Sequence, residues 1–194
     1  MIDYINGPII QLTPAYLSIE AGNIGYFINI SLSTYTKLEG KNECKILIHE
    51  VIREDSHQLF GFADKEERDI FRLLISVSGV GAATARMMLS SLTPAEIEKA
   101  IISADVHLLK SVKGIGLKTA ERIIVDLKDK MGKQTGGTGE IFAITDNTRR
   151  EEALSALVML GFAKGAVSKI LDKIVREEKN LAVEDMIRRA LKNL

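Results

Sequence analysis

Two short segments with the pattern glycine, apolar residue, glycine lie 35 residues apart in this 194-residue chain, as Gly79-Val80-Gly81 and Gly114-Ile115-Gly116. Glycine tolerates positive φ and carries no Cβ, so such a turn can bring the backbone N–H groups at the start of a following helix close to one point. Converging N–H groups, together with the positive end of a helix dipole, bind phosphate. The pattern therefore predicts two phosphate-binding turns.

The likeness of the two segments extends beyond their glycines. A shift of 35 residues superposes Leu73-Leu74, Val77 and Thr84-Ala85 on Leu108-Leu109, Val112 and Thr119-Ala120. One unit, an apolar helix followed by a glycine turn and a second helix, therefore occurs twice. A repeat of this kind is typical of the helix-hairpin-helix motif, which holds the DNA backbone without reading bases. A tight connection between two packed helices is the alternative for either copy alone, and the repetition makes it less favoured.

The second copy has the richer surroundings, because cations and a hydroxyl suited to phosphate oxygens flank it. The first copy continues into Ala82-Ala83, so its contact is expected to depend on backbone N–H groups, Ser78 and either Thr84 or Arg86, and to be weaker. The DNA-binding residues predicted are Ser78, Gly79, Val80, Gly81, Lys113, Gly114, Ile115, Gly116, Lys118, Thr119 and Arg122, with Val80 and Ile115 expected to turn inward between the helices.

Other chemistry has little support in the sequence. Leu117 stands where a P-loop needs glycine before its lysine, so nucleotide hydrolysis is not expected. Asp126 and Lys128 could serve a glycosylase, but solvated helix charges are the favoured interpretation. The three histidines lack ligand-like spacing, and the single Cys44 excludes a disulfide framework and a four-cysteine metal site. We expect no catalytic residue, no metal and no cofactor.

The elements that must position the two turns fall into separate segments. Apolar alternation through Ile24, Tyr26, Ile28 and Ile30 predicts strands, and five strands with a short helix near 32–38 favour an OB-fold barrel over an SH3-like one. From residue 64 the apolar period becomes helical, and Thr93-Pro94-Ala95-Glu96 is a capping box that opens a helix through residue 102.

The fold class predicted is a multidomain α+β protein. Its expected parts are an OB-fold barrel over 1–63, a tandem helix-hairpin-helix domain over 64–133, a flexible linker over 134–146 and a three-helix unit over 147–194. The linker prediction depends on the run GKQTGGTG at 132–139, which has no apolar period. The last three helices are expected over 148–160, 163–178 and 183–194.

Charge supports the placement of a polyanion site in the second part. The chain carries 26 basic and 26 acidic side chains, yet residues 64–133 hold twelve basic against ten acidic ones. Between Lys110 and Met131 there are six basic and three acidic residues. The sequence has neither a signal peptide nor an apolar run long enough to span a membrane, so a cytoplasmic protein is expected.

A family resemblance becomes specific when three segments are taken in order: residues 51–62, Gly79-Val80-Gly81, and Val112 to Arg122 with its run VKGIGLKTAER. With Glu67-Arg68 between them, they resemble the RuvA family over essentially the whole chain. That resemblance implies a subunit that binds four-way (Holliday) junction DNA in branch migration during recombination and repair. It also implies a homotetramer, one or two of which enclose a junction, a RuvB ATPase partner and the RuvC resolvase as a further one.

The same resemblance assigns individual residues. Glu54 and Asp55 match the acidic pin near the four-fold axis, although the dipeptide alone favours a plain turn between strands. The C-terminal stretch resembles a partner-binding domain similar to ubiquitin-associated domains, with Leu157, Leu160 and Phe162 as the partner-binding residues. The alternatives are a structure-selective nuclease or glycosylase that uses the same hairpins, and a single-strand binder whose barrel aromatics stack on bases.

Overall fold

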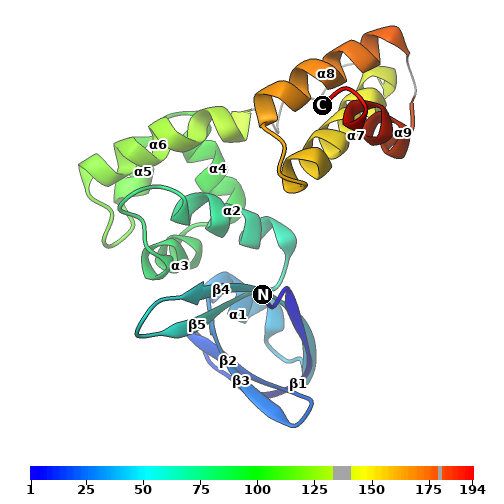
Figure 1. Ribbon diagram of the computed structural model, residues 1–194. Coiled ribbons are helices and arrows are strands. Elements are labelled where there is room, and N and C mark those ends of the chain that lie inside the picture. The colour runs from blue at the N-terminus through cyan, green and yellow to red at the C-terminus, as the bar shows by residue number, and fades with distance from the viewer. Residues whose placement is uncertain (133–140, 179–180) are drawn as a thin grey trace. The chain divides into compact units, whose positions relative to one another are not determined.

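The computed structural model describes residues 1–132, 141–178 and 181–194, and the chain forms two compact units, Met1–Thr135 and Gly136–Leu194 (Figure 1). Each unit has its own core, and each is described by itself.

The first unit begins with a five-stranded barrel. Its strands are β1 (Tyr4–Leu12), β2 (Tyr16–Ala21), β3 (Ile24–Ile30), β4 (Glu43–Ile52) and β5 (His57–Phe62), and they close in the order β1-β2-β3-β5-β4. All neighbouring strands are antiparallel except β3 and β5, which are parallel because helix α1 (Leu32–Leu38) and β4 intervene in the chain. The OB-like barrel and the short helix predicted from the sequence are confirmed.

Alternating apolar side chains fill the barrel, as the two-residue period of a strand requires. Leu17, Ile19, Ile28, Ile46 and Ile48 are each fully buried. The interior is thus a packed core, and any nucleic-acid site must lie on the outside or at a connecting turn.

Five helices follow: α2 (Lys65–Ile75), α3 (Ala82–Ser91), α4 (Pro94–Ile102), α5 (Val106–Lys110) and α6 (Leu117–Gly132). The capping box predicted at Thr93 and Glu96 is present, with the Thr93 hydroxyl accepting from Glu96 N and the Glu96 carboxylate accepting from Thr93 N at 2.8 Å. Phe71 of α2 lies 4.9 Å from Phe62 and 5.2 Å from Phe60, measured between ring centroids. The end of β5 therefore packs into the apolar core of the helices, while the barrel interior forms a core of its own.

The second unit contains α7 (Ile141–Met159), α8 (Lys164–Glu177) and α9 (Val183–Leu191), which pack around a small apolar core. The three helices predicted are confirmed, but α7 begins at Ile141 rather than near Thr148, inside the range 134–146 expected as a linker. The expected linker extended to Asp146, but aspartate and asparagine each disfavour a helix interior by only about 0.7 kcal/mol. Residues 133–140 lie outside the described part. No helix in the described ranges is long and apolar enough to cross a membrane.

Candidate nucleic-acid interface

The first glycine turn joins α2 to α3. Gly79 has φ of +92°, a conformation open to glycine, and Val80 N donates to Val77 O at 3.0 Å, which closes the turn. The Val80 side chain is buried beneath the turn, while Ser78, Gly79 and Gly81 are exposed. Val80 therefore contributes packing, as expected, and its own amide is used within the turn.

The second glycine turn, between α5 and α6, repeats this geometry. Gly114 has φ of +93°, Ile115 N donates to Val112 O at 3.1 Å, and Ile115 is buried. After the turn, Ala120 N donates to Gly116 O at 2.9 Å, as Ala85 N does to Gly81 O in the first copy. The sequence repeat is thus a structural repeat.

The second glycine of each pair has a different role from the first. Gly81 is the N-cap of α3, with φ of −85°, and no side chain caps that helix. A Cβ at Gly81 or Gly116 would meet nothing within 4 Å. The expectation of positive φ holds at the first glycine only, and the second leaves open space in front of the helix N-terminus. Because the first N–H groups of a helix lack intrahelical partners, that space is suited to a phosphate.

Side chains around the second turn reach solvent. Lys113 and Lys118 are exposed, Thr119 is half-buried, and neither lysine pairs with an acidic side chain in the part of the chain that the structure describes. Both ammonium groups are therefore free to contact phosphate oxygens. Each such contact favours DNA binding, because it releases counterions from the DNA.

Two predicted arginines are engaged within the protein. Arg122, on the first turn and a half of α6, donates from Nη1 to the carbonyl oxygen of Ser78 at 3.3 Å and so connects the two hairpins. Arg86, considered for the first hairpin, instead donates to Ala15 O at 2.9 Å and to Asn29 Oδ1 at 3.2 Å on the barrel. Because its guanidinium is directed to the barrel, Arg86 is a domain contact rather than a phosphate ligand.

The acidic dipeptide lies at the tip of the β4–β5 connection. Glu54 and Asp55 are exposed, and Arg53 N donates to Ser56 O at 2.8 Å across the turn. A groove of about 350 Å³ runs beside it, lined by the end of β4, from His49 to Arg53, and by Val80, Gly81 and Ala82 of the first hairpin. Arg53, which precedes the acidic dipeptide, and the first hairpin therefore line the same groove.

Comparison with known proteins agrees with this arrangement. Residues 1–61 match the family described as RuvA N terminal domain, 71–129 match SAM-like Helix-hairpin-helix tandem, and 148–194 match RuvA, C-terminal domain. Proteins of Christiangramia forsetii and Porphyromonas gingivalis, 51% and 50% identical over 194 and 202 aligned residues, are named Holliday junction branch migration complex subunit RuvA. In both cases the alignment covers 100% of each chain. The chain belongs to the RuvA family.

The C-terminal unit of this RuvA-family chain corrects one prediction. Leu157 is fully buried in the three-helix core, so its side chain cannot face a partner. Its place on the inner side of α7 follows from packing against Val167 and Leu171, which the apolar run 157–160 alone could not reveal. Leu160 is 63% exposed, and Phe162 is half-buried against the core.

Sequence reasoning missed two exposed neighbours of Leu160. Met159 is 86% exposed and Val158 is 38% exposed. Both line a groove of about 310 Å³ that Leu154 and Lys164 also border. The sequence shows that the run LVMLGF is apolar, but it does not show which of its residues are exposed. That depends on how α7 packs.

Proposed function

We propose that this chain is the four-way junction-binding subunit of a branch-migration complex. It holds the phosphate backbone without sequence specificity and brings the RuvB ATPase to the junction in recombination and repair. The observation that carries this function is the pair of matching glycine turns, each opening onto a helix N-terminus, joined by the Arg122–Ser78 hydrogen bond. The full-length relatives named as RuvA support it.

The residues assigned to DNA follow the repeat. Backbone N–H groups after Gly81 and Gly116 bind phosphate, Lys113, Lys118 and Thr119 add contacts at the second hairpin, and Ser78 adds one at the first. Arg122 acts mainly by holding Ser78. We assign no catalytic step to the chain, whose described residues include no group of three or more histidine, cysteine, aspartate or glutamate side chains placed to hold a metal.

Glu54 and Asp55 act as the acidic pin when four subunits surround the junction. Each pair of like charges about 10 Å apart in water contributes only about 0.4 kcal/mol before salt screening. That repulsion is too weak to oppose binding, but its sum over many carboxylate–phosphate pairs favours separated strands over a stacked junction.

The four expected parts, 1–63, 64–133, 134–146 and 147–194, then have separate tasks. The barrel carries the pin, the helical domain carries the hairpins, and the C-terminal unit engages RuvB through Met159, Leu160 and Phe162. Residues 141–146 of the expected linker belong instead to α7. The tetramer and any contact with RuvC belong to the same cytoplasmic assembly.

A gel-shift competition among four-way junction, duplex and single-stranded DNA at several salt concentrations, with the solution mass measured in parallel, tests the proposal. A tetramer presents eight hairpins, so if each neutralises one phosphate, log K falls with log salt at a slope of about −7. A slope near −2, or tighter binding to single strands, contradicts the proposal. Cleaved or abasic products from a labelled junction with magnesium would indicate a nuclease or glycosylase instead.

A further inference from the structure

Buried polar side chains concentrate at one place in the described residues. The four that are buried, Ser31, Thr34, Glu67 and Arg68, all lie where the barrel meets the helical domain. Burying a polar group costs free energy unless it is hydrogen-bonded, and burying a charge costs more. Their shared location indicates that this boundary, rather than either domain alone, requires specific polar contacts.

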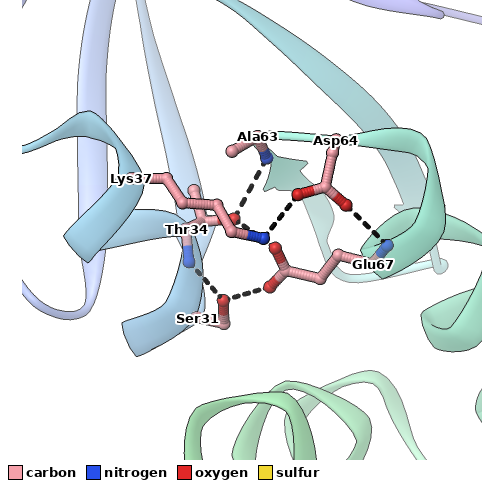
Figure 2. Close-up of polar contacts among 6 residues, drawn as sticks. All are labelled: Ser31, Thr34, Lys37, Ala63, Asp64 and Glu67. Carbon is pink, nitrogen blue, oxygen red and sulfur yellow. Dashed lines mark hydrogen bonds and ion pairs between the residues drawn. The ribbon is translucent and has the colours of Figure 1, made fainter. Parts of the chain in front are cut away.

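Glu67 lies at the centre of this group (Figure 2). Its side chain is 0% exposed, and each carboxylate oxygen accepts a hydrogen bond: Oε1 from the hydroxyl of Ser31, and Oε2 from Thr34 Oγ1 at 2.8 Å. Ser31 is the N-cap of α1 and Thr34 lies within that helix, whereas Glu67 belongs to the first turn of α2. One carboxylate thus joins a barrel helix to a helix of the DNA-binding domain.

The direction of these hydrogen bonds makes the cluster selective for an ionised carboxylate at position 67. Ser31 Oγ accepts from Thr34 N at 3.0 Å, and Thr34 Oγ1 accepts from Ala63 N at 3.1 Å. Each of the two hydroxyls accepts from a backbone N–H and has one proton left to donate to Glu67. An ionised carboxylate only accepts hydrogen bonds and therefore fits both donors. Beside the cluster, Lys37 Nζ pairs with Asp64 Oδ2 at 2.5 Å, and Asp64 caps α2 by accepting from Glu67 N.

This cluster resists rotation of one domain against the other. Any such rotation separates Glu67 from both hydroxyls and leaves a buried charge without partners, which is far more costly than the loss of a surface contact. Arg68 adds a second polar contact between the helical domain and the barrel, since its Nη1 donates to Asp3 O at 3.0 Å and to Asp3 Oδ1 at 2.7 Å.

The angle between the domains decides where the pin lies relative to the hairpins. Glu54 and Asp55 belong to the barrel, and both glycine turns belong to the helical domain. We propose that Glu67, held by Ser31 and Thr34, is a positioning residue that fixes the acidic pin relative to the two hairpins and thereby sets the preference for four-way junctions. This inference rests on the proposed function.

Two near-isosteric substitutions in the full-length protein test it. Glu67→Gln places an amide N–H against a hydroxyl that already accepts from a backbone N–H, and Thr34→Val removes one hydroxyl. Each is expected to lower the ratio of junction to duplex affinity by about five-fold. Affinity for duplex should change less than two-fold, because neither substitution touches a glycine turn or the Arg86 contacts with the barrel. Glu66→Gln, an exposed neighbour on the same helical turn, is the matched control and should leave the ratio unchanged.

The possible outcomes distinguish a failure of this inference from a failure of the proposed function. A wild-type protein without preference for junctions overturns the proposed function and this inference together. A wild-type preference that survives in both variants overturns the inference alone. Parallel loss of junction and duplex affinity, in step with the melting temperature, also overturns it, because that pattern marks general destabilisation.

A direct measurement of domain orientation needs no DNA. Spin labels at Gln58→Cys on the barrel and Lys110→Cys on the helical domain, in a Cys44→Ala background diluted with unlabelled protein, report the distance between the domains. We expect this distance distribution to broaden or shift in Thr34→Val, and in Glu67→Gln, relative to the Glu66→Gln control. An unchanged distribution contradicts the positioning role, and Thr34→Val keeps the test open if Glu67→Gln does not fold.

Discussion

The guanidinium of Arg122 donates a hydrogen bond to the carbonyl oxygen of Ser78, 44 residues earlier in the chain. The first residue follows the second glycine turn, and the other precedes the first turn. The contact therefore connects the two glycine turns, which the proposed function assigns to phosphate binding on a single DNA arm.

Loss of this contact should weaken DNA binding even when the charge is kept. An exposed hydrogen bond of this kind contributes about 1 kcal/mol, so Arg122→Lys should lower duplex affinity by about five-fold. Lys128→Ala removes a charge from an exposed site on the same helix and is the comparison. Wild-type affinity in Arg122→Lys, measured by fluorescence anisotropy, would show that Arg122 acts only as a cation.

The two glycines of the second hairpin should respond differently to alanine. Gly114→Ala is strained by about 1–2 kcal/mol because of its positive φ, and should lower both the melting temperature and DNA affinity. Gly116→Ala meets no atom in the free protein, so the melting temperature should stay unchanged while the new methyl group obstructs the phosphate. Thermal melts and gel shifts on both variants decide this, and undiminished affinity in Gly116→Ala removes the second hairpin from the site.

Neutralising the pin should change selectivity more than affinity. Glu54→Gln with Asp55→Asn keeps the turn, which the backbone bond from Arg53 N to Ser56 O closes, but removes the repulsion from the crossing strands. Junction binding should be equal or tighter, while the preference over duplex falls. Unaltered discrimination in the competition assay would show that the acidic turn has no part in junction recognition.

The exposed apolar residues at the C-terminal end of α7 and just after it should bind the partner, whereas the buried side of α7 should not. Leu160→Asp changes an exposed leucine and is expected to abolish stimulation of RuvB ATPase activity without loss of helix content. Leu191→Asp, at another exposed leucine, serves as the control. Leu157→Ala should cost about 2–5 kcal/mol of stability in the C-terminal unit, since Leu157 lies in its core. Full stimulation by Leu160→Asp would exclude this surface.

The stability contributed by Glu67 should depend on pH. Burial raises the pKa of its carboxyl, against the opposing hydrogen bonds from Ser31 and Thr34 and the charge of Lys37. The folded protein therefore takes up this proton at a higher pH than the unfolded chain, and its stability increases as pH falls through the raised pKa. Glutamine does not titrate, so the free energy of unfolding of wild type minus that of Glu67→Gln should increase from pH 7 to pH 5.

Urea titration measures this difference through the tyrosines, all four of which lie in the barrel. The neighbouring Asp64 and Lys37 are present in both proteins, so their contributions largely cancel. A difference that is flat over this range, or that decreases toward pH 5, would contradict the expected direction.

Local periodicity alone determined much of this protein. The alternation in 24–30 predicted a barrel strand, Thr93 and Glu96 predicted a capped helix, and the 35-residue repeat predicted two hairpins with buried Val80 and Ile115. These features depend on neighbours within a few residues, whose spacing the sequence states directly.

Only the tertiary structure decided which polar and apolar side chains meet across long separations. Arg122 with Ser78, Arg86 with Asn29 and Glu67 with Ser31 are partners 44, 57 and 36 residues apart. Spacing carries no information about such pairs, because they arise from the packing of elements that are far apart in the chain. The same packing buries Leu157 and leaves Leu160 exposed, although both belong to one apolar run.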